Sequence, residues 1–110
     1  MNNSLRVLLV EDDPADARLI QISLNEVEGA VSLDLVWVEK LSKAFESLTE
    51  RGADAILLDV NLPDSQGLNT VTRMVEKAPT VPIIVLTGLA DEVLTVQALQ
   101  KGAQDYLVKD

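Results

Sequence analysis

Five short apolar runs alternate along the chain with longer segments in which apolar residues recur at helical spacing. The runs cover residues 5–10, 31–38, 55–59, 82–87 and 104–109, which are the lengths of β-strands. The first, third and fourth are apolar at nearly every position, as expected of strands that helices cover on both faces. The second instead alternates, with Leu33, Leu35 and Trp37 on one side, and this favours the edge of a sheet.

The segments between the runs predict four helices. Asp13 and Pro14 are typical of an N-cap and a first helical residue, and an apolar stripe of Ala17, Ile20, Leu24 and Val27 follows them before Gly29. The other three helices are expected at about 41–52, 65–77 and 91–101. Strands and helices that alternate with short connections predict an α/β fold, a doubly wound parallel sheet that forms one domain over residues 1–110.

Polar residues follow the ends of four predicted strands. The first strand is followed by Glu11, Asp12 and Asp13, and the others end on Asp59, Thr87 and Lys109. Each residue alone has a structural interpretation, since acids after a strand often only cap the next helix. The carboxyl ends of parallel strands, however, share one rim, where doubly wound sheets bind their ligands. The coincidence at four strand ends therefore favours a functional site.

Crowded carboxylates at this rim predict a bound cation. Two like charges about 4 Å apart repel by roughly 4 kcal/mol at an effective dielectric constant near 20. The chain has no cysteine and no histidine, so oxygen atoms are the ligands on offer. This donor set suits Mg²⁺ best, and Mn²⁺ could substitute.

Composition narrows the classes of function further. A net charge of −9 disfavours direct binding to nucleic acid or to an anionic membrane surface. The absence of cysteine and histidine excludes disulfides, thiolate metal sites and histidine-based triads. The N-terminal apolar run is too short for a signal peptide, and no stretch has the length of a membrane span, so we expect a cytoplasmic protein.

Four stretches of the chain resemble the signature stretches of response-regulator receiver domains, in the same order and at similar spacing. They are VLLVEDD, AILLDVNLPDSQGL, PIIVLTG and GAQDYLVK, and the resemblance covers essentially the whole chain. It implies a flavodoxin-like sheet with strand order 2-1-3-4-5. It also implies two-component signalling, in which a sensor histidine kinase or phosphotransfer protein supplies a phosphoryl group and an effector domain or partner protein gives the output. Such a domain labels itself once rather than turning over as an enzyme.

The resemblance also implies roles for the acidic residues. Asp59 matches the phospho-accepting aspartate, and Asp12 and Glu11 match the acidic pair that binds Mg²⁺ directly or through water. Asn61 matches the position whose backbone carbonyl completes the metal ligands from the protein.

Further residues match the groups that respond to the phosphoryl group. Lys109 matches the lysine that pairs with a phosphoryl oxygen, and Thr87 matches the hydroxyl that turns toward another. Thr87 and Tyr106 match the pair that switches conformation. Leu89 matches a position that tunes hydrolysis, where an apolar side chain cannot orient water, so we expect a persistent phosphoryl state.

Two features depart from the family pattern. Asp110 follows the lysine where the family usually has a proline in a cis peptide, so we expect a trans bond there. The sequence also stops after strand five, without the fifth helix of the family. We therefore expect a receiver domain truncated after strand 5, with Tyr106 and Val108, or Leu107, more exposed than in a complete domain. An exposed apolar face of the sheet at these residues predicts either self-association as a homodimer or reduced stability.

Two other classes of function compete with this interpretation. A haloacid-dehalogenase-like phosphatase also uses an aspartate at a strand end with Mg²⁺, but it needs a second aspartate where Asn61 stands. A receiver that is never phosphorylated would act as a constitutive binding module, and the intact set of acids, threonine and lysine argues against this. Turnover distinguishes the first alternative, and labelling distinguishes the second.

Overall fold

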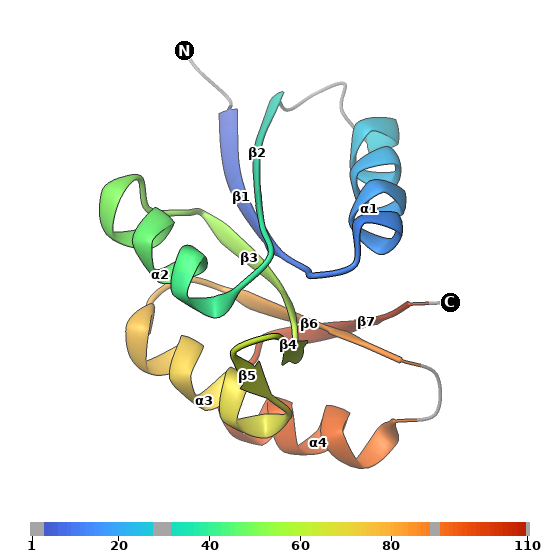
Figure 1. Cartoon of the computed structure of the whole chain (residues 1–110), viewed down its shortest axis with the longest axis vertical. Helices are drawn as coiled ribbons and strands as arrows, with labels where there is room; N and C mark the ends of the chain where they lie inside the picture. Colours follow the sequence, from blue (N-terminus) through green and yellow to red (C-terminus); the bar gives the residue numbers. More distant parts are fainter. Residues whose placement is uncertain (1–3, 28–31, 89–90, 110) are drawn as a thin grey trace.

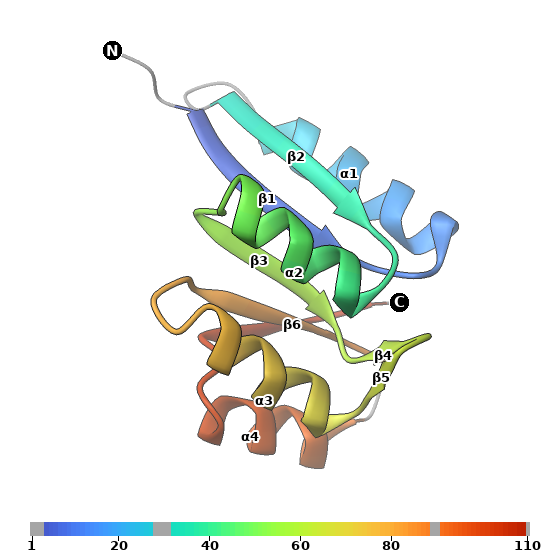
Figure 2. The same cartoon turned by 60° about the vertical axis from the view of Figure 1, so that its left-hand side comes forward.

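A parallel sheet of five strands forms the centre of the molecule (Figures 1 and 2). The computed structural model describes residues 4–27, 32–88 and 91–109. The strands of this sheet are β1 (Ser4–Val10), β2 (Ser32–Val38), β3 (Ala55–Asp59), β6 (Ile83–Thr87) and β7 (Asp105–Val108). Their order is β2-β1-β3-β6-β7, and all neighbours run parallel. The predicted order 2-1-3-4-5 is thus confirmed, as is the edge position of the second strand.

Helices cover both faces of this sheet, as a doubly wound fold requires. One face carries α1 (Pro14–Val27), and the other carries α2 (Leu41–Glu50), α3 (Leu68–Lys77) and α4 (Glu92–Gln100) (Figure 1). Successive strand residues point to opposite faces. Val7 and Leu9 accordingly pack in the cluster with α1, whereas Leu8 and Val10 pack in the larger cluster with the other three helices.

The start of α1 follows the predicted cap. The Asp13 carboxylate accepts the backbone N–H of Ala15 at 2.8 Å and that of Asp16 at 3.4 Å. Three residues of the expected apolar stripe, Ala17, Ile20 and Leu24, pack against the sheet, while the side chain of Val27 lies outside the described part of the chain. The position of the first helical turn is therefore fixed directly after the end of β1.

The third helix begins later than the sequence predicted. A short antiparallel hairpin, β4 (Asn61–Leu62) and β5 (Ser65–Gln66), precedes it, and α3 starts at Leu68 rather than near Ser65. The backbone of Gly67 has φ of 62°, a left-handed conformation that favours glycine and separates the hairpin from the helix. The buried hydroxyl of Thr70 donates a hydrogen bond to the Val60 carbonyl at 2.8 Å and so holds the loop against the helix.

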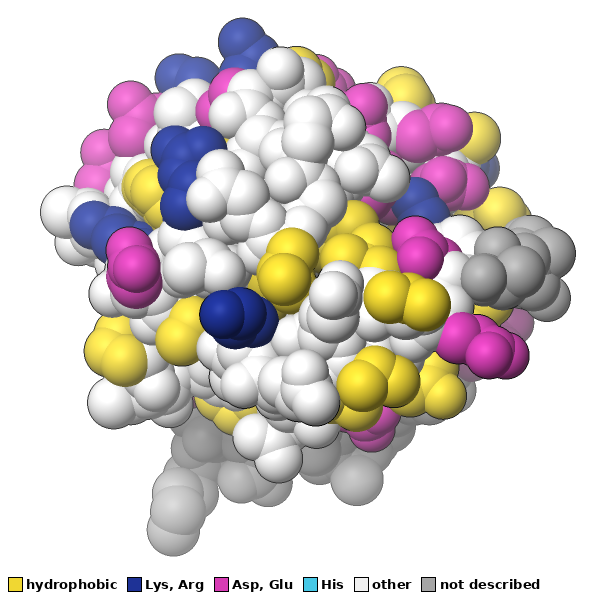
Figure 3. All heavy atoms as spheres, turned by 90° about the horizontal axis from the view of Figure 1, so that it is seen from below, with side chains coloured by type: hydrophobic (Ala, Val, Ile, Leu, Met, Phe, Trp, Pro, Cys, Tyr) yellow, Lys and Arg dark blue, Asp and Glu magenta, His cyan; other side chains and the backbone are white. Residues whose placement is uncertain are grey.

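The side chains of β7 are exposed on both faces of the strand. The exposed fractions are 42% for Tyr106, 53% for Leu107 and 47% for Val108, so both sets of side chains are exposed, where the sequence led us to expect one set. On the α1 side, Leu19 and Leu107 line an apolar groove between the helix and β7. Figure 3 views the molecule from below, the side on which α4 lies in Figure 1, and shows hydrophobic side chains lying between charged ones there.

Two expectations concern residues that the structure does not describe. Leu89 and Asp110 lie outside the described ranges. Within those ranges, none of the helices has both the length and the apolar character needed to cross a membrane.

Candidate functional site

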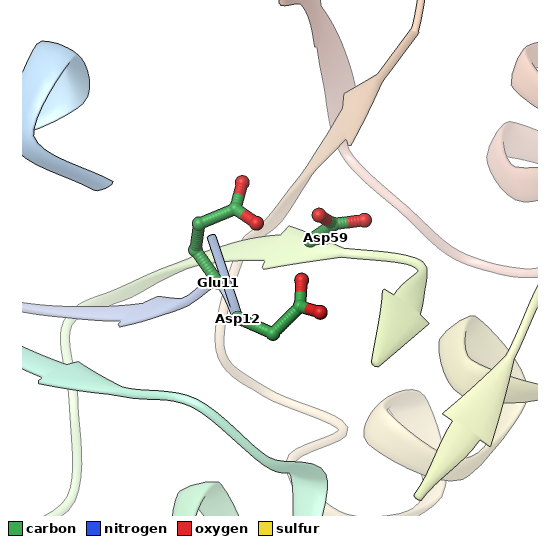
Figure 4. A group of neighbouring side chains, drawn as sticks. All are labelled: Glu11, Asp12 and Asp59. Atoms are coloured by element: carbon green, nitrogen blue, oxygen red, sulfur yellow. The ribbon is translucent and has the colours of Figure 1, made fainter. Parts of the chain in front are cut away.

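Three carboxylates meet at the carboxyl rim of the sheet (Figure 4). Glu11 and Asp12 follow β1, and Asp59 ends β3 on the neighbouring strand. Val10 pairs with Leu58 in the sheet, so the residues that follow them are brought side by side. One oxygen from each carboxylate lies within 4.8 Å of the others. These three acids are among those that the sequence placed at this rim, whereas Asp13, which it also placed there, caps α1 instead.

The ammonium group of Lys109 lies among these acids. Its Nζ is 2.8 Å from Glu11 Oε1, 2.9 Å from Asp59 Oδ2 and 3.1 Å from Asp16 Oδ2. The backbone N–H of Lys109 donates to the Thr87 carbonyl at 2.7 Å, which continues the pairing of β6 with β7. The lysine is therefore placed by the sheet and oriented by carboxylates from three different segments.

Burial and hydrogen bonding shift the protonation of this cluster. Glu11 is fully buried, and burial together with its hydrogen bond to Asp59 raises its pKa to about 7. Burial by itself lowers the pKa of Lys109, but hydrogen bonds to Asp59 and Glu11 outweigh it and hold the pKa above its usual value. The cluster therefore keeps a positive lysine and tends to retain a proton on Glu11.

The donor set of this cluster fits a hard divalent cation. A single ammonium group does not balance Glu11, Asp12, Asp16 and Asp59 when all four are ionised. Burial contributes most to the raised pKa of Glu11, and the negative charge of Asp59 raises it further. Carboxylate oxygens are the ligands that Mg²⁺ and Mn²⁺ accept, so the residues present can hold such an ion.

The remaining predicted site residues lie around the cluster. The Asn61 backbone N–H donates to Asp59 Oδ1 at 2.9 Å, and the Asn61 side chain is exposed. Thr87 is buried, and its hydroxyl donates to the Leu107 carbonyl at 3.4 Å. Tyr106 lies further back along β7, opposite Val85. Asn61 is thus in contact with Asp59, whereas Thr87 is hydrogen-bonded to the neighbouring strand.

A hollow opens over Asp59 at this rim. It has a volume of about 320 Å³, and its lining includes Asp12, Asp59, Asn61, Gly88 and Lys109. A small anionic donor can therefore approach the Asp59 carboxylate from solvent, although that carboxylate is largely buried.

The family was established by comparison with known proteins. Residues 7–110 match the family model described as the response regulator receiver domain. The chain belongs to this family. Receiver domains accept a phosphoryl group and bind a divalent metal ion, in agreement with the carboxylate cluster and lysine at the rim.

Individual relatives support the same assignment. The receiver is 36% identical over 101 residues to the regulatory protein LuxO of Vibrio cholerae, and 36% identical over 104 residues to the DNA-binding response regulator MtrA of Mycolicibacterium smegmatis. These alignments cover 92% and 94% of the chain but 21% of LuxO and 43% of MtrA. The crystal structure of the Mn²⁺-bound form of the response regulator Rcp1 matches with a TM-score of 0.80 and 27% identity, covering 96% of this chain and 81% of that one.

Two residues of the receiver site were not identified from the sequence. Asp16 bonds Lys109 from the first turn of α1, and no pattern in the sequence indicated this contact. Trp37 donates its indole N–H to the Glu11 carbonyl at 2.8 Å, while the Glu11 N–H donates to Val38 at 3.0 Å. The edge strand β2 therefore holds Glu11 through both of its backbone groups.

Proposed function

We propose that this receiver accepts its phosphoryl group on Asp59. The observation that carries the proposal is the position of its carboxylate, with Oδ2 2.9 Å from Lys109 Nζ and Oδ1 2.9 Å from the Asn61 N–H. The carboxylate is held at the floor of the hollow, next to a permanent positive charge. A nucleophile in this position is oriented, and the charge of an incoming phosphoryl group meets a cation.

In the proposed transfer, a carboxylate oxygen of Asp59 attacks the phosphorus atom of the donor. An O–P bond forms as the bond between phosphorus and the leaving atom breaks, and the leaving group keeps the electron pair. The product is an acyl phosphate on Asp59. Because such transfers need mainly positioning and charge neutralisation, Lys109 and the Thr87 hydroxyl suffice as the protein's contacts to the phosphoryl oxygens.

The metal ligands of the proposed reaction are the carboxylates of Glu11, Asp12 and Asp59 and the backbone carbonyl of Asn61. Their grouping within 4.8 Å, for the three carboxylates, supports this assignment. A bound Mg²⁺ would neutralise part of the negative charge on the phosphoryl oxygens. Mn²⁺ is a second candidate, since the related Rcp1 was crystallised in a Mn²⁺-bound form.

Thr87 and Tyr106 are proposed to transmit the change of state. Val85 pairs with Tyr106 and Thr87 pairs with Val108, so Thr87 and Tyr106 lie on neighbouring strands of one sheet face, two positions apart. If the Thr87 hydroxyl leaves the Leu107 carbonyl for a phosphoryl oxygen, space behind it opens toward Tyr106. A phosphoryl group that bonds in one arrangement and not the other shifts the population of the two.

The partners of the receiver are proposed from its family. A sensor histidine kinase or phosphotransfer protein would supply the phosphoryl group. The chain spans less than half of LuxO and MtrA, so the output would come from an effector domain or a partner protein. The net charge of −9 makes direct contact of this chain with DNA unfavourable. A homodimer through the exposed side chains of β7 is a further candidate assembly.

The assignment of Asp59 is tested by labelling with acetyl phosphate and Mg²⁺, followed by mass spectrometry. We expect one phosphoryl group per wild-type chain and none on Asp59→Asn. Asp91→Asn is the matched control, because Asp91 lines the same hollow and should leave labelling unchanged. Label that survives in Asp59→Asn would refute the assignment.

The same preparation tests whether the receiver is a phosphatase. We propose that it modifies itself and loses the phosphoryl group only slowly, so that phosphate release should stay close to the amount of labelled protein. Release of many equivalents of phosphate per chain would contradict this and favour a hydrolase. Absence of any label on the wild type would instead favour a constitutive binding module.

A further inference from the structure

Lys109 is held by one carboxylate that does not belong to the acidic cluster. An ammonium group has three N–H donors, and here they have three carboxylate partners on Glu11, Asp59 and Asp16. Glu11 and Asp59 also belong to the group that could hold a metal ion, together with Asp12. Asp16 stands apart from that group, on the first turn of α1.

In the proposed reaction, the carboxylates of Glu11 and Asp59 bind Lys109 and also take part in metal binding or phosphoryl transfer. A cation would draw on oxygens of Glu11 and Asp59, and phosphorylation converts Asp59 from a carboxylate into an acyl phosphate. Lys109 must then give up at least part of its contact with both residues. Asp16 is the partner whose charge and hydrogen bonding do not change in these steps.

The position of Asp16 is well defined before the reaction. Its backbone N–H lies 3.4 Å from the Asp13 carboxylate that caps α1, and α1 packs on the sheet through Ala17 and Ile20. The Lys109 backbone is fixed by its bond to Thr87, but four flexible carbon atoms separate that backbone from the ammonium group. A fixed anion near the end of this side chain therefore decides where the ammonium group lies.

We propose that Asp16 is a positioning residue that keeps Lys109 within reach of the phosphoryl group when Glu11 and Asp59 are engaged by the cation and the transferred group. This inference rests on the proposed function. It also gives Asp16 a role in metal binding, because Asp16 offers Lys109 an alternative partner and lowers its competition for the cluster.

A direct effect of negative charge is the main alternative. Asp16 could simply attract the cation and repel the donor through space, without acting through Lys109. The two explanations differ in what an asparagine does, because Asp16→Asn removes the charge but retains an oxygen acceptor, whereas Asp16→Ala removes both. They also differ in whether the effect needs Lys109.

The first experiment measures the initial rate at which acetyl phosphate and Mg²⁺ label the full chain. We expect Asp16→Ala to slow labelling about tenfold, the lower end of the losses typical when an orienting partner is removed. Asp16→Asn should stay within about threefold of wild type. Glu26→Ala, which removes one negative charge ten residues further along the same helix, should match wild type. Equal losses in the alanine and asparagine variants would overturn the proposal.

The second experiment is a double-mutant cycle on Mg²⁺ affinity, measured by calorimetry. Asp16→Ala should weaken binding about fivefold when Lys109 is present, and by less than about twofold in a chain that also carries Lys109→Met. An equal effect in both backgrounds would show a direct charge effect and overturn the proposal. Thermal unfolding of each variant identifies any loss that comes from misfolding.

A spectroscopic measurement follows Lys109 itself. With ¹⁵N-labelled lysine, the Nζ resonance should already differ between wild type and Asp16→Ala without metal, because Asp16 Oδ2 lies 3.1 Å from Nζ, and the difference should grow once Mg²⁺ and beryllofluoride are added. Identical spectra in the loaded state would overturn the role of Asp16. If the wild type is labelled on Asp59 and the Asp16 variants behave like the wild type, only this inference is refuted. A wild type that is not labelled would refute the proposed function.

Discussion

The carboxylate of Asp64 accepts the backbone N–H of Leu41 at 2.9 Å, although the two residues lie 23 positions apart. Its second oxygen accepts the N–H of Ser42 at 3.0 Å. Lys40, at the N-cap position of α2, makes no side-chain cap hydrogen bond. Two N–H groups at the start of α2 are therefore satisfied by Asp64, in the turn between β4 and β5, and this ties α2 to the hairpin that carries Asn61.

Loss of this remote cap should destabilise the domain. Asp64→Ala is expected to lower the free energy of unfolding by about 1 kcal/mol, the usual cost of losing an N-cap side chain. Asp91→Ala is the matched control, because Asp91 stands at the N-cap of α4 without a side-chain cap hydrogen bond. This substitution should lower the free energy of unfolding by less than Asp64→Ala does. Urea titrations measure both values, and equal losses would show that the Asp64 contact contributes little.

The sequence predicted most elements of the fold because their signals are local. The apolar runs marked the five strands of the sheet, and Asp13 with Pro14 marked the start of α1. The hairpin before α3 was missed because its strands have two residues each, too short for a periodic pattern. The Asp64 cap was missed for another reason, since it depends on how a distant turn packs against α2.

Metal binding should depend on Asp12 far more than on its neighbour Asp13. Asp12 belongs to the carboxylate cluster, while Asp13 caps α1. Asp12→Ala is expected to weaken Mg²⁺ binding by about tenfold or more, as loss of a ligand should. Asp13→Ala should mainly lower stability, by about 1 kcal/mol. Calorimetry with Mg²⁺ gives the two affinities, and equal losses would overturn this order.

Glu11 should make the metal-free protein less stable as pH rises. Its pKa is raised from 4.5 to about 7 in the folded state, so between these values the folded chain binds more protons than the unfolded chain. The free energy of unfolding therefore falls with increasing pH across this window, by at most about 3 kcal/mol. Lys109 does not oppose this trend, because its raised pKa places its own loss of stability above pH 10.

Urea titrations between pH 5 and pH 7.5, with a chelator present, would measure this dependence. Glu11→Gln mimics the protonated side chain and should flatten the curve. A wild-type stability that is constant or that rises over this range would contradict the pKa assignment for Glu11.

The chemistry of the site was predictable where it depends on strand ends. Glu11, Asp59 and Lys109 follow or end strands, so the topology alone brings them to one rim. The contact of Asp16 with Lys109 depends instead on the direction of α1 relative to β7. No spacing rule in the sequence specifies that angle, and it becomes visible only when the helix is packed on the sheet.

The Thr87 hydroxyl should couple phosphorylation to Tyr106. Thr87→Ala is expected to accept the phosphoryl group but to lose most of the change in the Tyr106 ring resonances that phosphorylation causes. Thr87→Ser retains the hydroxyl and should preserve that change. NMR spectra of the three proteins with and without beryllofluoride and Mg²⁺ test this, and an undiminished response in Thr87→Ala would exclude a coupling through this hydroxyl.

The exposed strand β7 predicts a contrast between two leucines of the sheet. Leu58 on β3 is fully buried, whereas Leu107 on β7 is 53% exposed. Leu58→Ala should therefore lower the free energy of unfolding by about 2–5 kcal/mol. Leu107→Ala should cost about 1 kcal/mol or less, since half of its surface already contacts water in the monomer.

The same pair of variants tests whether the apolar groove beside α1 is covered in solution. If copies of the chain associate through this groove, Leu107 becomes buried between them. Leu107→Ala should then lower the free energy of unfolding by more at high protein concentration than at low concentration. Sedimentation velocity on wild type and Leu107→Ala over a range of concentrations separates the two cases. A monomeric wild type in which Leu107→Ala is as costly as Leu58→Ala would contradict the exposure of β7. A concentration-dependent dimer that Leu107→Ala weakens would support the homodimer proposed above, because the lost contact would then lie between copies.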